Sequence, residues 1–109
     1  MRSKIRRREA LACGVVLLAS PSWGAGPQMH RIGIDNLAFG PAPGDLHVND
    51  IVEWTNSDIL RHTATATDGS FDIDLPPGAR GRTILKRAGG VSYVCRFHPG
   101  MKGRLEVAP

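Results

Sequence analysis

The sequence predicts an all-β domain, either a β-sandwich or a small barrel. Three observations support this fold class. Short β-branched and apolar segments recur at even spacing, which is typical of sandwiches and barrels. The chain has 109 residues with 13 glycines and 8 prolines, and their clusters indicate many turns. No stretch keeps the 3.6-residue apolar period of a long amphipathic helix.

Four of the seven expected strands lie in the first two thirds of the chain. Residues 29–34 alternate apolar and polar side chains, and residues 46–48 form a short strand before an Asn-Asp turn. The clearest strand is 51–55, with sequence IVEWT, and residues 61–67 are rich in Thr and Ala. Glycine and proline at 40–44 predict a loop or a sheet edge between the first two strands.

Three further strands are expected at residues 82–86, 91–95 and 104–107. Pro-Pro-Gly makes residues 75–81 an expected irregular segment, and Ala-Gly-Gly at 88–90 is expected to separate two strands. The two-residue period of a strand predicts which side chains share a face. The residues predicted to face the core are Val52, Trp54, Val91, Tyr93, Cys95, Leu105 and Val107.

Residues 1–24 have the pattern of an export signal peptide. Five basic residues precede an apolar run at 10–19 and then small residues around Gly24 and Gly26, where cleavage is expected. An apolar helix of about ten residues is too short to cross a hydrocarbon core of roughly 30 Å. We therefore expect residues 25–109 to form a single exported, periplasmic domain, with the Sec and twin-arginine routes both open.

The basic charge of the chain belongs to the predicted signal. The formal charge is +4, but residues 25–109 contain nine basic and nine acidic residues. A neutral domain gives no reason to expect a nucleic-acid partner or membrane insertion. Cys13 lies within the signal, so Cys95 is the one cysteine expected in the exported domain. A lone thiol in an oxidising compartment is expected to be buried, reactive or bound to a metal.

One loop near the end of the chain carries metal-binding side chains. Cys95, His98 and Met101 follow one another at three-residue spacing. A helix would separate the first and last by about 9 Å along its axis, and a strand would turn Cys95 and His98 to opposite faces. Pro99 and Gly100 interrupt both structures. The sequence therefore predicts a tight loop that can place all three side chains around one ion.

Thiolate, imidazole and thioether together favour copper. Zinc accepts cysteine and histidine, but a structural zinc site needs four N, S or O donors and does not use thioether sulfur. Haem attachment of the c type needs C-x-x-C-H, which the sequence lacks. Two histidines, one cysteine and a weak axial methionine are the ligands of a type 1 copper centre. One type 1 copper ion is therefore the expected cofactor if a second histidine reaches the loop.

The second histidine is expected to be His62. It follows the strand that contains Trp54 and begins another strand, so it would lie at the same end of a sandwich as the loop after Cys95. His47 sits in a short polar strand, and His30 lies near the start of the exported domain. The predicted metal ligands are His62, Cys95, His98 and Met101.

Other interpretations of these residues stay open at this point. Each residue alone is common without a metal: Cys95 as a buried inert thiol, His98 as a surface histidine and Met101 as a core residue. A Cys–His nucleophilic pair is a further alternative, but this spacing beside a proline gives no evident base geometry. The joint spacing in an exported domain favours the metal site.

Several segments resemble the cupredoxins, the type 1 blue copper proteins, especially the small amicyanin-like and plastocyanin-like members. The C-x-x-H-x-x-M loop is the most specific of them. The segments are 36–41, 48–56, 62–65, 68–72, 77–78, 93–95, 98–99 and 101–103. The resemblance implies a Greek-key β-sandwich that binds copper and transfers single electrons. One departure is Thr63, where the family often has an asparagine that ties the ligand loops together.

The predicted function is that of an electron carrier in which copper cycles between Cu(I) and Cu(II), with redox proteins as donor and acceptor. A copper-binding or copper-delivery protein is the alternative, because it uses similar ligands. We expect no enzymatic activity, since the chain has four histidines and no H-x-H pair. The domain is expected to be a monomer that exchanges electrons through the edge of His98. The uncharged residues expected around that edge are Pro99, Gly100, Ile59, Leu60 and 37–39.

Overall fold

The computed structural model describes residues 26–109, and the predicted export signal at 1–24 lies outside them. The described part of the chain forms nine β-strands and holds no helix long and apolar enough to cross a membrane. The strands are β2 (Met29–Asp35), β3 (Ala38–Phe39), β4 (Leu46–His47), β5 (Ile51–Asn56), β6 (His62–Ala66), β7 (Asp72–Leu75), β8 (Arg80–Ile84), β9 (Gly89–Val94) and β10 (Lys102–Ala108).

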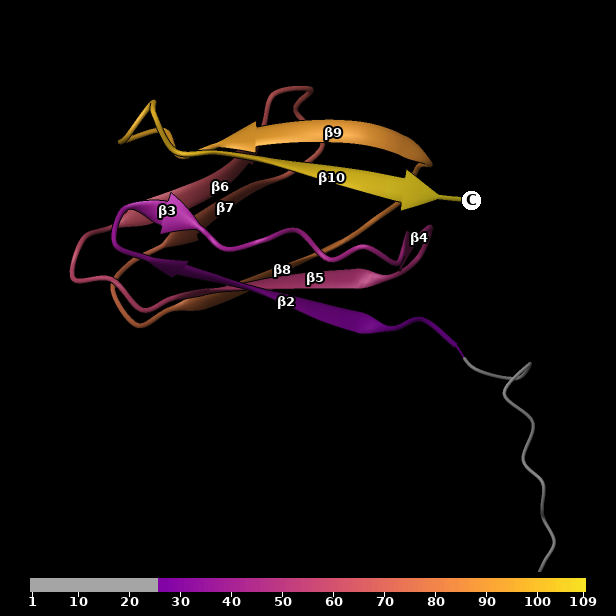
Figure 1. The fold of residues 1–109 in the computed structure, drawn as a ribbon, viewed down its shortest axis with the longest axis horizontal. Helices are drawn as coiled ribbons and strands as arrows, with labels where there is room; N and C mark the ends of the chain where they lie inside the picture. Colours follow the sequence, from indigo (N-terminus) through magenta and orange to yellow (C-terminus); the bar gives the residue numbers. More distant parts are fainter. Residues whose placement is uncertain (1–25) are drawn as a thin grey trace, which may run out of the picture.

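The strands form two mixed sheets that pack face to face (Figure 1). One sheet has the order β4-β10-β9-β6-β7 and the other has the order β3-β2-β5-β8. Strand β2 runs parallel to β5 and β4 runs parallel to β10, whereas the other pairs are antiparallel. The chain changes sheet five times: on either side of β4, between β5 and β6, between β7 and β8, and between β8 and β9. The predicted all-β Greek-key sandwich is confirmed.

The core lies between the inner faces of the two sheets, as the two-residue period predicts. Tyr93 is at its centre, with its ring centroid 4.7 Å from that of Phe39, 5.4 Å from that of Trp54 and 6.0 Å from that of Phe71. Such pairs add to the stabilisation from apolar burial. Val91 is half-buried, and the other six predicted core residues are buried: Val52, Trp54, Tyr93, Cys95, Leu105 and Val107.

The prediction of about seven strands is wrong in number because β3 and β7 also form. Strand β3 is only two residues long and pairs with the end of β2. Strand β7 has the sequence DIDL, in which Leu75 is buried while Asp72 and Asp74 are exposed. The two aspartates disfavour a strand locally. Pairing with β6 outweighs that preference.

The sequence predicts that two segments lie outside the strands, one as an irregular segment and one as a connection between two strands. Both are partly strand in the structure. The Pro-Pro-Gly turn is short, because the N–H of Ala79 already donates to the carbonyl of Pro76. Arg80 therefore pairs with Thr55 as the first residue of β8. Gly89–Gly90 belongs to β9, where both glycines pair with β10. In each case, cross-strand pairing extends a strand into residues that the local sequence marks as a turn.

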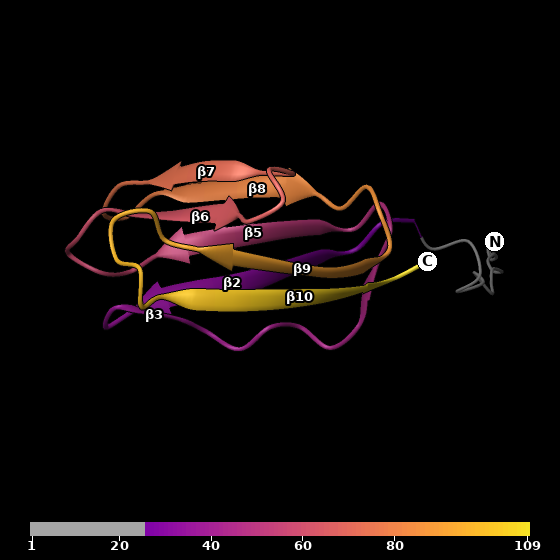
Figure 2. The same cartoon turned by 90° about the horizontal axis from the view of Figure 1, so that it is seen from above.

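The strand directions bring three connections to one end of the sandwich. Strands β5 and β9 point the same way, so the loop 57–61 after β5 and the loop 95–101 after β9 lie at the same end (Figure 2). The turn at 36–37 between β2 and β3 is also there. The end of β10 lies at the other end of the molecule. Residues far apart in the sequence therefore meet where the predicted ligands fall.

Candidate metal centre

Three of the four predicted ligands come together at the end formed by these loops. His62 is the first residue of β6 and is fully buried, and Cys95 directly follows β9 and is buried as well. His98 lies on the loop after Cys95 and is half-buried. Within residues 26–109, they form the one group of three or more His, Cys, Asp or Glu side chains that could hold a metal ion, and their donor atoms all lie within 4.8 Å of one another.

The loop after β9 is tight because its backbone groups bond to one another. The N–H of His98 donates to the carbonyl of Cys95, and the N–H of Met101 donates to the carbonyl of His98 at 2.8 Å. The N–H of Cys95 in turn donates to the carbonyl of Met101 at 3.2 Å. These bonds close the loop and bring His98 back toward Cys95. The tight loop predicted from Pro99 and Gly100 is thus present.

The donor atoms of the three side chains form a triangle. The Nδ1 atoms of His62 and His98 are 3.2 Å apart, and Sγ of Cys95 lies 3.8 Å from the first and 3.5 Å from the second. Such a triangle has a point roughly 2.0 Å from each corner, close to metal bond lengths of about 2.0–2.1 Å to nitrogen and 2.3 Å to sulfur. The donor set fits one metal ion.

The other predicted or considered residues occupy different places. Met101 is buried in the same loop. The Nε2 atom of His30 lies 2.9 Å from Oδ2 of Asp50, and His30 pairs with Val52 near the start of β5, at the opposite end of the sandwich. His47 is exposed on β4. The structure thus places His62, rather than His30 or His47, beside the loop.

Hydrogen bonds favour the thiolate form of Cys95. Burial raises the pKa of Cys95, but the backbone N–H of Thr63, the two histidines and the backbone N–H of Phe97 outweigh it and lower the pKa to about 6. The Thr63 N–H donates to Sγ at 3.4 Å. Because the thiolate is the form that binds metals, Cys95 is largely in its ligating form at neutral pH.

The second ring nitrogen of His62 is held by Asp58, on the loop after β5. Nε2 of His62 lies 2.9 Å from Oδ2 of Asp58. Burial lowers the pKa of His62, but the hydrogen bonds to Asp58 and Cys95 outweigh it and raise the pKa. Two hydrogen bonds lower the pKa of Asp58, the larger effect coming from the backbone N–H of Leu37 and the smaller from His62, although burial raises the pKa. Asp58 is therefore a carboxylate at neutral pH.

Thr63 links the two ligand-bearing segments by more than its backbone N–H. Its Oγ1 accepts a hydrogen bond from the N–H of Arg96 at 2.9 Å and lies 2.8 Å from Oγ1 of Thr65. The hydroxyl of Thr65 donates to Oδ1 of Asp72, so the hydroxyl hydrogen of Thr63 points to Thr65. Threonine thus supplies the connection between loops that the family often obtains from asparagine.

Sequence reasoning missed Asp58 as part of the site. The sequence Asn-Ser-Asp at 56–58 indicates the end of a strand, and in the structure β5 ends at Asn56, one residue later than the predicted strand 51–55. An acidic residue four positions before a predicted ligand histidine was an available signal. That spacing alone does not place the carboxylate at the ring, because the path of the loop decides the distance.

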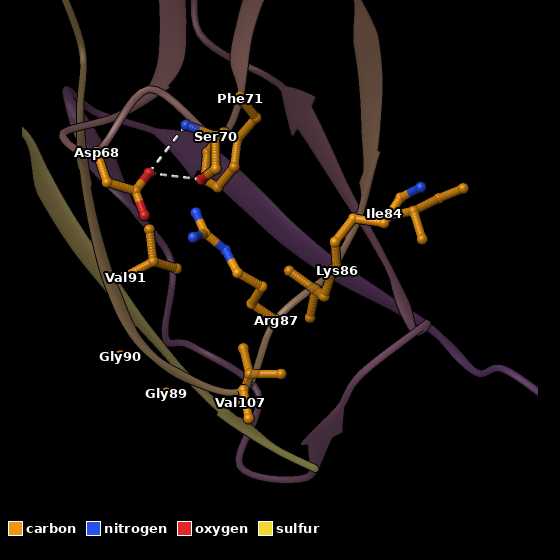
Figure 3. Close-up of a pocket in the computed structure, with 12 residues that line it drawn as sticks. Asp68, Ser70, Phe71, Ile84, Lys86, Arg87, Gly89, Gly90, Val91 and Val107 are labelled. Atoms are coloured by element: carbon orange, nitrogen blue, oxygen red, sulfur yellow. Dashed lines mark hydrogen bonds between the residues drawn. The ribbon is translucent and has the colours of Figure 1, made fainter.

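A pocket of about 350 Å³ lies by the start of β9, whereas Cys95 follows the other end of that strand. Figure 3 shows the residues that line it. Its walls come from the turn after β6, the end of β8 and the start of β9, and Arg87 extends into it. At its rim, Asp68 accepts hydrogen bonds from the N–H and the hydroxyl of Ser70. None of the predicted ligands lines this pocket, so it is separate from the candidate site.

Two mixed sheets with a His–Cys–His group at one end define a cupredoxin-like sandwich. The comparisons with solved structures agree. A reduced amicyanin variant matches with a TM-score of 0.63 and 23% identity over 71% of this chain and 79% of that one. Amicyanin from Paracoccus versutus (Thiobacillus versutus) has a TM-score of 0.61 and 21% identity over 71% of this chain and 78% of its own. A purple cupredoxin from Nitrosopumilus maritimus has a TM-score of 0.58 and 23% identity over 72% and 98%.

No family model matches the chain. The structural likenesses show that this chain has the cupredoxin fold, and the expected resemblance is confirmed at the level of the fold.

Proposed function

We propose that this protein binds one copper ion as a type 1 centre and carries single electrons between redox proteins. The observation that carries the proposal is the buried triangle of two imidazole nitrogens and one thiolate sulfur, from His62, His98 and Cys95. One of the similar solved structures is the Cu(I) form of an amicyanin variant. Bound copper would supply one-electron chemistry by alternating between Cu(I) and Cu(II).

The chain's own residues would hold the ion in the same place in both oxidation states. His62, Cys95 and His98 would be the strong ligands, and Met101 would be a weak axial one. The Thr63 N–H orients the sulfur, and Asp58 orients the ring of His62. Ligands that scarcely move suit electron transfer. Burial of His62 and Cys95 favours a carrier over a copper-delivery protein, because delivery needs ligands that a recipient can reach.

His98 would be the route for electrons. It is half-buried between exposed neighbours, whereas His62 and Cys95 are inaccessible. Exposed apolar side chains occur on the three connections at this end of the sandwich, and we call them the apolar rim: Leu37, Ile59, Leu60 and Phe97, which are 47%, 88%, 43% and 49% exposed. Such a rim suits brief redox encounters of small area, which require little desolvation of charge.

Copper loading tests the metal site directly. The wild-type protein should bind one Cu(II) and develop an intense visible absorption from the thiolate–copper bond. Cys95→Ser should abolish the strong colour, and His98→Gln should weaken binding and change the spectrum. His47→Gln is the control, because this exposed histidine lies on β4, away from the cluster. A strong colour that survives in Cys95→Ser would contradict the proposed site.

A second measurement separates a carrier from a delivery protein. A carrier should retain copper through repeated reduction and oxidation in the presence of an apo acceptor protein, while a delivery protein should lose it. We further propose that residues 1–24 are removed on export and that residues 25–109 act as a periplasmic monomer. Mass spectrometry of the exported protein and its solution mass test these two points.

A further inference from the structure

The carboxylate of Asp58 joins three parts of the site. Its Oδ2 lies 2.9 Å from Nε2 of His62 and accepts a hydrogen bond from the backbone N–H of Leu37 at 2.9 Å. Its Oδ1 accepts from the N–H of Ile59 at 3.1 Å. The turn at 36–37 and the loop that carries Asp58 therefore fix the carboxylate, independently of its contact with His62.

This arrangement selects one tautomer of His62. A carboxylate only accepts hydrogen bonds, so Nε2 of His62 carries the hydrogen. In the neutral ring, Nδ1 then presents its lone pair, and it faces Sγ of Cys95 and Nδ1 of His98. The ring is fully buried, so water does not compete for Nε2. The nitrogen that faces the other ligands is the one left free to bind a metal.

We propose that Asp58 is a positioning residue that holds His62 in the metal-binding tautomer and, given the copper site proposed above, strengthens its bond to Cu(II) relative to Cu(I). A carboxylate hydrogen-bonded to a ligand imidazole raises the basicity of the ring, and loss of such a partner typically costs roughly 10- to 100-fold in metal affinity. The more highly charged ion gains more from a more basic ligand. Asp58 therefore lowers the reduction potential of the centre.

The loop that carries Asp58 is built to keep this geometry. The side-chain amide of Asn56 donates to the carbonyls of Leu60 and Leu75, at 2.8 and 2.9 Å. Its amide oxygen accepts from the N–H of Asp58 at 2.8 Å. Asn56 is fully buried, so these bonds are protected from water. A loop that only reversed the chain direction would not need a buried amide that fixes both of its ends.

Two variants separate the effect of charge from that of the hydrogen bond. Asp58→Asn removes the charge but keeps an oxygen that can accept from His62, and Asp58→Ala removes both. Asp45→Asn is the control, because Asp45 has a side chain that is 90% exposed and lies away from the site. We expect the Cu(II)-to-Cu(I) affinity ratio to fall by about tenfold in Asp58→Ala, which corresponds to a rise of about 59 mV for a one-electron couple. Asp58→Asn should lie between Asp58→Ala and the wild type.

Nitrogen NMR of the copper-free protein tests the positioning without any metal. At a pH above the raised pKa of His62, where the ring is neutral, the wild type should show a single Nε2–H tautomer with a slowly exchanging proton, and Asp58→Ala should show a mixture of tautomers. If Asp58→Ala loses only folding stability, while the tautomer and the potential match the wild type, Asp58 merely supports the turn at 36–37 and the inference is overturned. A wild-type protein that binds no copper would instead overturn the proposed function and the effect on the potential. The tautomer of His62 would still show whether Asp58 positions the ring.

Discussion

Thr63 shows how one residue can replace another by changing which groups make the hydrogen bonds. The resemblance to cupredoxins leads one to expect an asparagine at this position, with several side-chain hydrogen bonds. Here the hydroxyl of Thr63 accepts a hydrogen bond from the N–H of Arg96 and donates one to the hydroxyl of Thr65. The hydroxyl of Thr65 in turn donates to the carboxylate of Asp72. The segments that begin with His62 and follow Cys95 are thereby joined beside the candidate metal site.

Thr63→Val should destabilise the copper-free protein by roughly 1–3 kcal/mol, because the N–H of Arg96 loses its acceptor. Valine keeps the shape of threonine, and the backbone N–H to Cys95 is retained. Denaturant unfolding of the apoprotein measures the effect. Thr83→Val on β8 is the control, since the half-buried Thr83 makes no side-chain hydrogen bond to residues 26–109. Equal losses in the two variants would contradict the role assigned to the Thr63 hydroxyl.

Met101→Leu should leave copper bound and raise its reduction potential. Leucine fills a similar buried volume, so the loop is expected to fold. Removal of a weak thioether donor destabilises Cu(II) more than Cu(I). Voltammetry and the copper content of the purified variant measure both effects. A lower potential, or complete loss of copper, would show that Met101 is not a weak axial ligand.

The ligand loop and the loop 57–61 differ in how far the sequence predicts them. Cys95, His98 and Met101 lie within seven positions, so their chemistry can be read locally, and Pro99 indicates the loop that gathers them. The role of Asp58 depends on the path of a separate loop. Its carboxylate reaches His62 only because Asn56 and the turn at 36–37 fix that path.

The same distinction explains the strands. The two-residue period predicts the inward-facing side chains of β5, β9 and β10, although Glu53 on the outer face of β5 is buried as well. Strand β7 and the first residues of β8 and β9 form through pairing with strands distant in the sequence. Local composition contains little of that information. The fold class was therefore predictable from sequence, whereas the number and the ends of the strands were not.

Ile59→Lys should slow electron self-exchange without changing the copper spectrum. Ile59 is 88% exposed on the loop 57–61 and belongs to the apolar rim. A lysine there places like charges opposite each other when two molecules meet, and we expect a decrease of roughly three- to tenfold that weakens with salt. Ile84→Lys is the matched control, because Ile84 is exposed at the end of β8, away from the site. Identical rates in the two variants would mean that electrons do not pass through the rim.

At the scale of the whole molecule, one buried carboxylate organises the outer face of the β2-β5-β8 sheet. Glu53, at the centre of β5, lies 3.1 Å from Nε of Arg31 on β2 and 2.8 Å from Nε of Arg82 on β8. Hydrogen bonds from Arg82 and then Arg31 lower the pKa of Glu53 from its ordinary 4.5, although burial opposes them. The three strands are thus connected across their outer face by one acid and two bases.

This ion-paired group predicts a loss of stability in acid. A carboxyl with a lowered pKa in the folded state stabilises the fold fully above its unfolded pKa, here 4.5, and the contribution is lost as the pH falls through the lower folded value. The free energy of unfolding of the apoprotein should therefore decrease below about pH 4.5. Glu53→Gln should be less stable at pH 7 and should lose less on acidification. Glu106→Gln, in an exposed pair with Arg104, should behave like the wild type.

The place of β10 in the sheet has a consequence for the order of events during synthesis. This strand follows the ligand loop in the sequence, yet it lies in the sheet between β9 and β4. When a ribosome has added Met101, all four proposed copper ligands have been made, but β9 has no partner on one side and β4 has none at all. The five-stranded sheet that contains His62 and borders Cys95 is complete only after residues 102–108 have been added. A copper ion bound in the completed site would therefore belong to a chain that already extends through β10.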